Sequence, residues 1–79
     1  MRRFVRSFFV RRKAQVTVIQ DGDSRQFEVW VWRPRTAPAM VRHFPYAPGA
    51  ASFVRDVAVR AAVDLASAEK GHPDTREAL

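Results

Sequence analysis

The segment Gln15–Arg33, QVTVIQDGDSRQFEVWVWR, decides the fold. Apolar residues alternate with other residues on both sides of the turn-forming run Asp21-Gly22-Asp23-Ser24, a pattern that is typical of a β-hairpin. If the turn is centred between Gly22 and Asp23, Val18 lies opposite Phe27 and Val16 opposite Val29. The residues expected on the core face of this hairpin are Val16, Val18, Phe27, Val29 and Val31.

The opposite face of the hairpin is expected to be mixed, with two large rings at alternate positions. Its residues are Thr17, Ile19, Gln26, Glu28, Trp30 and Trp32. One interpretation is that Trp30 and Trp32 stack on the bases of a nucleic acid or on a partner's arginine. The other is that they form a second small core, covered by the amino-terminal strand or by the proline-rich segment.

The segments on either side of the hairpin predict the rest of the sheet. Residues 4–12 are rich in Phe and Val and predict a first strand, and we prefer this to a basic amphipathic helix because a sheet is already available to join. Prolines make residues 33–38 an irregular crossing, after which residues 40–44 form an edge strand. A helix is expected over residues 52–70, ended by Gly71 and Pro73, and the tail 72–79 is expected to fray.

The predicted fold is therefore a single basic α+β domain spanning residues 1–79. A small antiparallel meander of three or four strands packs against one C-terminal helix. The sheet-facing stripe of the helix is expected to contain Val54, Val57, Ala58, Ala61, Leu65 and Ala68. Val59 and Val63 fall on the far side of the helix, where they predict a site of self-association, so that the protein is a monomer or a weak homodimer.

The first thirteen residues, MRRFVRSFFVRRK, carry the whole formal charge of +6. This N-terminal basic cluster predicts a surface for an anionic partner, because a localised field steers phosphate or carboxylate toward it. Strand alternation places Arg2, Arg6 and Arg12 on one face and Arg3, Arg11 and Lys13 on the other. Arg33 and Arg35, beside the tryptophans, are added to the predicted site. The competing interpretation is that these charges only protect a sheet edge from aggregation.

No motif in the chain predicts catalysis. The chain has no cysteine, and neither His43 nor His72 has an acidic or histidine neighbour at metal-ligand spacing. No serine lies in a nucleophile elbow, and no glycine-rich run precedes the helix. We therefore expect a non-enzyme without metal or cofactor. Because no apolar run approaches the roughly 18–20 residues of a membrane span, we also expect no membrane partner and a cytoplasmic location.

The organisation of the chain resembles the small phage anti-CRISPR proteins that act on type I surveillance complexes. The resemblance rests on the start at Met1, the sheet-like run from Phe4 to Trp32, the single helix from Ser52 to Lys70 and the lack of reactive groups. It implies an inhibitor in the host cytoplasm that binds an acidic or nucleic-acid-bearing surface of a protein or nucleoprotein complex and blocks access to target DNA. The alternative is a sequence-tolerant DNA-binding protein, similar to the three-stranded arm-binding domains of phage integrases.

Overall fold

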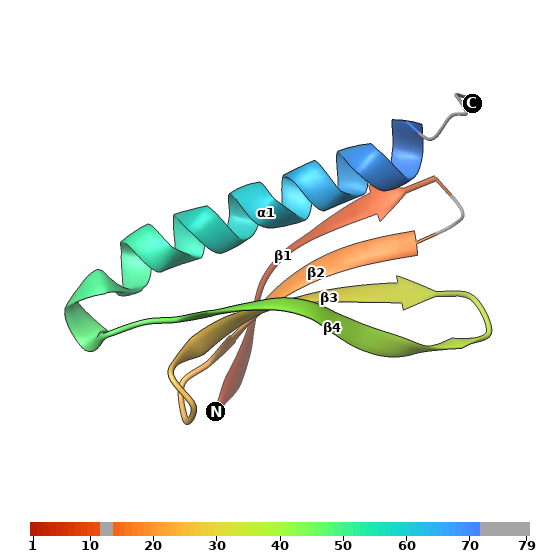
Figure 1. The fold of residues 1–79 in the computed structure, drawn as a ribbon. Coiled ribbons are helices and arrows are strands. Elements are labelled where there is room, and N and C mark those ends of the chain that lie inside the picture. Colours follow the sequence, from red (N-terminus) through yellow and green to blue (C-terminus); the bar gives the residue numbers. More distant parts are fainter. Residues whose placement is uncertain (12–13, 72–79) are drawn as a thin grey trace.

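The computed structural model describes residues 1–11 and 14–71 and shows an α+β fold: a four-stranded antiparallel sheet with one C-terminal helix (Figure 1). The strands follow one another in the order β1-β2-β3-β4, so the sheet is a meander and the predicted fold class is confirmed. The elements are β1 (Arg2–Val10), β2 (Ala14–Asp21), β3 (Gln26–Arg33), β4 (Thr36–Pro45), the 3₁₀ turn η1 (Pro48–Ala50) and α1 (Ala51–Gly71).

The central hairpin has the predicted core face but a different register. Val16 pairs with Val31 and Val18 with Val29, two residues away from the predicted pairing. The Asp21 carboxylate accepts hydrogen bonds from the backbone N–H groups of Asp23 and Ser24, and Arg25 adopts a left-handed φ of 54°. The loop therefore comprises residues 22–25, and its centre lies one residue later than expected. Moving the centre by one residue shifts every pair by two, which leaves each side chain on its predicted face.

β1 is a strand, as expected, but it contains a bulge that the strand alternation did not predict. Phe4 pairs with Ile19 and Arg6 with Val18, so Val5 is an extra residue. A bulge reverses the alternation of faces that follows it. Arg6 consequently lies on the same face as Arg3, and the prediction that Arg6 shares a face with Arg2 is wrong. The strand begins earlier than predicted, since Arg2 already pairs with Asp21, and it ends earlier because Arg11, with a φ of 50°, turns the chain.

The segment after β3 is regular, which corrects the predicted irregular crossing. Arg33 pairs with Thr36, and Pro34 and Arg35 alone form the turn, with Arg35 at a φ of 60°. β4 extends over ten residues and lies at the border of the sheet, where the missing N–H groups of its prolines break no ladder bond. The predicted edge strand is thus confirmed, and it is longer than expected.

The core lies between the sheet and α1, and the helix is rotated relative to the prediction. Its contribution to the buried core is Ala58, Ala62 and Ala66, spaced by four residues. Small side chains at this spacing let the helix axis approach the sheet closely. Val57 is exposed and Val59 packs against the core, so both were assigned to the wrong side. The strand residues of the core are Val10, Ala14, Val16, Val18, Phe27, Val29 and Val31.

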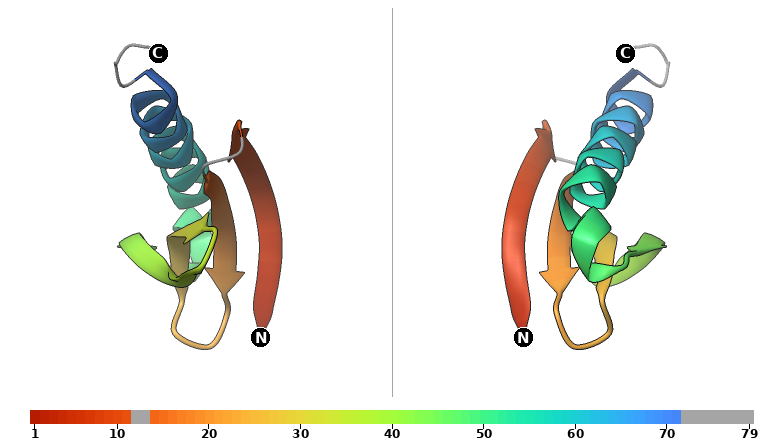
Figure 2. Two further views of the ribbon diagram at one scale, coloured as in Figure 1. Left: turned by 90° about the vertical axis from the view of Figure 1, so that its right-hand side faces the viewer. Right: turned by 90° about the vertical axis from the view of Figure 1, so that its left-hand side faces the viewer.

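The molecule therefore has two layers, with α1 on one face of the sheet. The two side views in Figure 2 show β1 and β4 on opposite sides of the helix. The other face of the sheet, which we call the open face, is covered by no element of residues 1–11 and 14–71. No helix in the same residues combines the length and the apolar character that crossing a bilayer requires.

Candidate functional site

The open face consists of four rows of side chains that run across the sheet. Their order follows from the observed register, with the bulge at Val5 included. The rows are Arg2-Asp21-Gln26-Pro45, Phe4-Ile19-Glu28-His43, Ser7-Thr17-Trp30-Met40 and Phe9-Gln15-Trp32. This face holds the mixed residues that the hairpin pattern predicts, and β1 and β4 add exposed rings and a methionine to them.

A buried carboxylate organises one end of the open face. Glu28 is only 4% exposed and accepts hydrogen bonds from Gln26 at 3.0 Å and from the Trp30 ring N–H at 2.8 Å. Arg2 reaches it with both terminal nitrogens, at 3.2 Å to Oε2 and 2.7 Å to Oε1. Arg2 also lies 3.5 Å from the Asp21 carboxylate and 5.8 Å from the centre of the Trp30 ring. Its charge is therefore neutralised within the fold.

These contacts shift the protonation equilibria in a consistent direction. Burial raises the pKa of the Glu28 carboxyl, but the hydrogen bonds from Arg2, Trp30 and Gln26 outweigh it, and the pKa lies below its ordinary value. The hydrogen bond to Glu28 raises the pKa of Arg2. Burial also opposes ionisation of Asp21, but the donors from Ser24 and Asp23 leave its pKa lowered. All three groups are charged near neutral pH.

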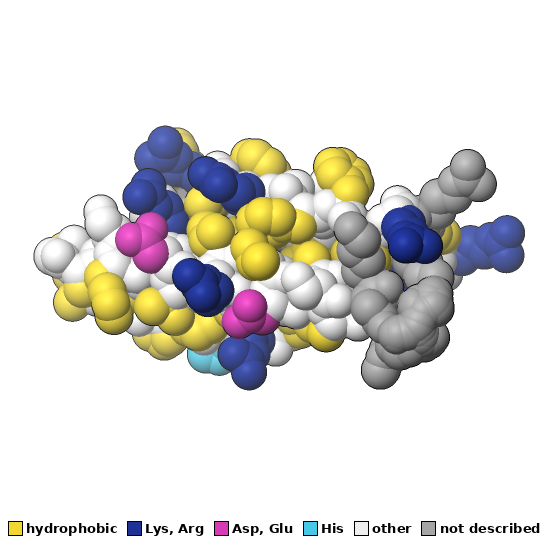
Figure 3. Space-filling view, turned by 90° about the horizontal axis from the view of Figure 1, so that it is seen from above, with side chains coloured by type: hydrophobic (Ala, Val, Ile, Leu, Met, Phe, Trp, Pro, Cys, Tyr) yellow, Lys and Arg dark blue, Asp and Glu magenta, His cyan; other side chains and the backbone are white. Residues whose placement is uncertain are grey.

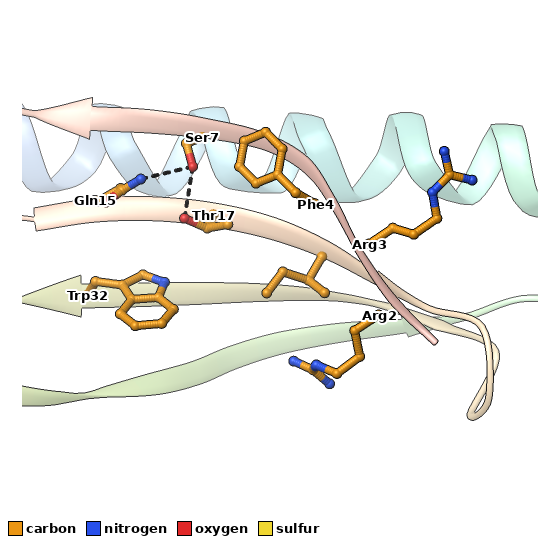
Figure 4. A pocket seen from close by; sticks show the side chains of 8 residues that line it. Arg2, Arg3, Phe4, Ser7, Gln15, Thr17 and Trp32 are labelled. Atoms are coloured by element: carbon orange, nitrogen blue, oxygen red, sulfur yellow. Dashed lines mark hydrogen bonds between the residues drawn. The ribbon is translucent and has the colours of Figure 1, made fainter.

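The centre of the open face is a shallow hollow of about 340 Å³ between Phe4 and Trp32 (Figure 4). Its floor contains a second polar group: the Ser7 hydroxyl lies 2.9 Å from that of Thr17 and accepts a hydrogen bond from Gln15 at 3.1 Å. Figure 4 shows Arg2 extending across the sheet toward β3 and β4, whereas Arg3 extends away from the sheet past the edge of β1. Both arginines line the hollow, Arg2 from its floor side and Arg3 from the edge strand.

The two tryptophans lie on the same face of β3 but differ in their surroundings. Trp30 is half-buried and is held by its hydrogen bond to Glu28, whereas Trp32 is 42% exposed. Neither the amino-terminal strand nor the proline-containing β4 covers this face, because both lie in the sheet itself. The interpretation that the tryptophans form a second core under those segments is therefore wrong for the described residues. Stacking of the tryptophans on a ligand remains a prediction.

The predicted cationic site is not assembled into one surface. Arg2 lies on the open face, whereas the register places Arg3 and Arg6 on the helix side of β1, from where the Arg3 side chain also reaches the edge of the open-face hollow. Arg11, Arg33 and Arg35 lie at the end of the sheet that carries the β1–β2 and β3–β4 turns, the opposite end from Arg2. The predictions for Arg12, Lys13 and the tail 72–79 fall outside the described residues.

On the helix side, the fold instead builds a basic groove between β1 and α1. This β1/α1 groove has a volume of about 410 Å³ and is lined by Val5, Arg6, Arg55, Asp56, Val59, Arg60 and Val63. The three valines come from both elements and line the groove together with the arginines. Figure 3 shows basic side chains gathered toward one end of this side of the molecule, next to hydrophobic ones.

The charge of the groove is only partly balanced. Its single acid, Asp56, lies 3.8 Å from Arg55, and both side chains are more than half exposed, so the pair is weak. Arg3, Arg6 and Arg60 form no ion pair within the part of the chain whose side chains the structure describes. Three arginines and one aspartate give the groove a net charge of +2.

Arg55 and Arg60 were not predicted as site residues. In sequence they belong to a run of alternating charges on the helix, which is typical of a solvated face. Val59 and Val63 were predicted at an interface, and the structure places them in the β1/α1 groove with Arg6. The signal that could have linked these residues is the unusual position of two β-branched apolar residues beside a charged helix face.

Comparisons with protein-family models, with curated proteins and with solved structures find no match. Among the side chains that the structure describes, those of residues 1–11 and 14–68, no group of three or more His, Cys, Asp or Glu could hold a metal ion. The arrangement of the groove and of the open face is therefore the basis for any functional argument.

Proposed function

We propose that this is a non-catalytic binding protein that attaches to an acidic surface of a larger protein or nucleoprotein complex through the β1/α1 groove. The observation that supports this most strongly is the convergence of Arg6, Arg55 and Arg60 from two elements in one groove, with only Asp56 as a counter-charge in its lining. Arginines next to valine side chains suit a carboxylate beside an aliphatic or aromatic side chain.

The chemistry of the rim favours a protein ligand over bare phosphate. Val5, Val59 and Val63, which line the groove beside the arginines, are stabilised when apolar surface covers them, and a phosphate backbone offers little such surface. Guanidinium groups bind carboxylates through two parallel hydrogen bonds, which orient the partner as well as attract it. Arg3, on the same face of β1, extends the positive field beyond the groove.

The alternative, in which the sheet lies in the major groove of DNA, finds less support in this geometry. The face that would enter the groove carries Asp21 and Glu28, and the arginine that the register places on it, Arg2, is bound to both. A duplex presented to this face would meet exposed phenylalanines, with Arg3 at the edge of β1 as a further cation beside the hollow. Direct DNA binding is therefore retained as an outcome of the test and not as the proposal.

The proposed mode of action is inhibition by coverage, in the cytoplasm of the host cell. A chain of this size acts on a larger assembly by occupying a surface that the assembly needs, and it requires no reactive group for this. A type I surveillance complex is the partner that the resemblance implies, and it is the first complex to test.

The groove is tested with two charge-matched double variants. Arg6→Ser with Arg60→Ser removes two charges from the groove, and Arg25→Ser with Arg42→Ser removes two charges elsewhere, because Arg25 lies in the β2–β3 loop and Arg42 lines a different hollow. Binding is measured by NMR titration with an acidic, leucine-containing peptide and by pull-down of a purified type I surveillance complex. Gel shifts on free duplex DNA are run over a salt series.

We expect the groove variant to lose about tenfold or more in affinity for the peptide and the complex, because each charge-assisted hydrogen bond contributes about 1.5–3 kcal/mol. The control variant should bind as the wild type does. Equal loss in the two variants would reduce the effect to net charge and would remove the groove from the proposal. Tight binding of free DNA, with a log-log salt slope of about −0.9 per phosphate, would establish the alternative. Failure to capture the complex while peptide binding persists would reject that partner alone.

A further inference from the structure

We propose that the open face binds the open face of a second copy of this chain, so that two sheets pack face to face with their helices on the outside. The face carries large apolar side chains that no described element covers: Phe9 is 73% exposed, Phe4 68%, Trp32 42% and Met40 41%. Several large exposed apolar side chains on one face of a small protein mark an interaction site. Stacked sheets pack about 10 Å apart through interdigitating side chains of this type.

The buried polar groups of the open face, Glu28 and Thr17, already have partners within the chain, which favours a dry contact. Glu28 accepts from Arg2, Gln26 and Trp30, and the Ser7 and Thr17 hydroxyls are hydrogen-bonded to each other. Covering groups that already have partners costs little, whereas a face built to hold a polar ligand would present unpaired donors and acceptors. Because these hydrogen bonds are made within the chain, apolar surface can cover the face without leaving them unpaired.

The distribution of charge identifies the occupant as a second copy. Two chains of formal charge +6 repel each other, so they can associate only through a surface that carries little of that charge. The open face meets most of this condition: Arg2 is balanced by Asp21 and Glu28, Arg6 and Arg60 lie on the helix side, and the one unbalanced arginine that reaches the hollow, Arg3, does so from the edge strand. In a face-to-face dimer both basic grooves point outward and stay accessible, so this inference is independent of the proposed partner.

The size of the face sets the strength of the contact. The principal extents of the molecule are 42 × 24 × 15 Å, so its broad face has a footprint of at most about 1,000 Å². A standard interface takes about 800 Å² from each partner. The dimer therefore needs most of the open face, and one charge placed within it should be disruptive.

The test measures the oligomeric state by sedimentation velocity, from micromolar to millimolar protein, for the wild type and two matched variants. Phe9→Glu places a charge on the open face, and Phe53→Glu places the same charge on α1, where Phe53 is equally exposed at 71%. Because neither ring is buried in the monomer, both variants should fold, which circular dichroism checks. Phe4→Glu repeats the test at the opposite end of β1.

We expect a wild-type dimer whose dissociation constant rises by roughly tenfold or more in Phe9→Glu and Phe4→Glu and stays unchanged in Phe53→Glu. Because Trp30 and Trp32 are the only tryptophans, their quenching by acrylamide should fall as the dimer forms. Salt should strengthen the dimer by screening the +6 charges, whereas it weakens binding of an acidic partner in the groove. A monomer at every concentration, or a dimer in which Phe9→Glu has no effect and the tryptophans stay accessible, would overturn the inference.

Discussion

Replacing Glu28 with glutamine tests whether the buried carboxylate holds the open face together. Glu28 is 4% exposed, and its two oxygens accept from Arg2, Gln26 and Trp30. Glu28→Gln keeps the volume but replaces one oxygen with an NH₂ group. If that group takes the Oε2 position, it faces Arg2 Nη1 and Gln26 Nε2, which are both donors. At least one charge-assisted hydrogen bond is lost and one donor is left without an acceptor.

The expected magnitude follows from these losses. A hydrogen bond to a charged group contributes about 1.5–3 kcal/mol, and the Arg2 side chain is 47% exposed, so solvent screening places its share at the low end. We expect Glu28→Gln to lower the free energy of unfolding by about 2–3 kcal/mol. For a domain of this length, that is a fall of about 10–20 °C in Tm.

The assay is urea unfolding followed by tryptophan fluorescence and by circular dichroism, and Asp56→Asn is the control. Asp56 also loses a charged partner, but its pair with Arg55 is long and exposed, so its substitution should change the free energy of unfolding by less than about 0.5 kcal/mol. A double-mutant cycle of Glu28→Gln with Arg2→Met isolates the coupling between the two side chains. If Glu28→Gln costs no more than Asp56→Asn, the carboxylate is not a structural centre and the reasoning fails.

Three further outcomes follow from the same structure. Folding lowers the pKa of Glu28, so the ionised carboxylate stabilises the fold above its unfolded pKa of about 4.3, and this stabilisation is lost as the pH falls through the lower folded pKa. The difference in urea stability between wild type and Glu28→Gln should therefore shrink in that acid range. A difference that stays constant with pH would contradict this. Phe27→Ala should cost about 3–5 kcal/mol in unfolding free energy because Phe27 is 1% exposed, whereas Phe53→Ala should cost almost nothing in the same melt. Arg35→Gly should raise the Tm by relieving the left-handed conformation, by about 0.5–1 kcal/mol in unfolding free energy, and a lower Tm would show that the Arg35 side chain contributes more than its backbone costs.

The faces of the central hairpin could be predicted from sequence because alternation is a local property. Val16, Val18, Phe27, Val29 and Val31 are all buried, and their parity does not depend on where the turn is centred. The register could not be predicted in the same way. It depends on hydrogen bonds of the Asp21 carboxylate within the loop and on one residue with positive φ, which the pattern of apolar residues does not contain.

The helix was also predicted only in part: its extent could be predicted from the sequence, but its rotation about its own axis could not. Its extent was predictable from composition and from its glycine and proline ends, and α1 spans Ala51–Gly71. Its rotation was not, because Val57 and Ala62 are both acceptable on an apolar stripe by periodicity alone. In the folded protein Ala58, Ala62 and Ala66 pack against the sheet, since these small side chains allow the closest approach of the helix axis.

By itself, the sequence determined the α+β class, the central hairpin, the helix and the location of the excess charge near the amino terminus, because each depends on neighbours along the chain. The tertiary structure alone decided which charges act together. One extra residue at Val5 moves Arg6 to the helix side, where it meets Arg55 and Arg60. Such a meeting depends on how elements some fifty residues apart pack in space, and no local pattern encodes that packing.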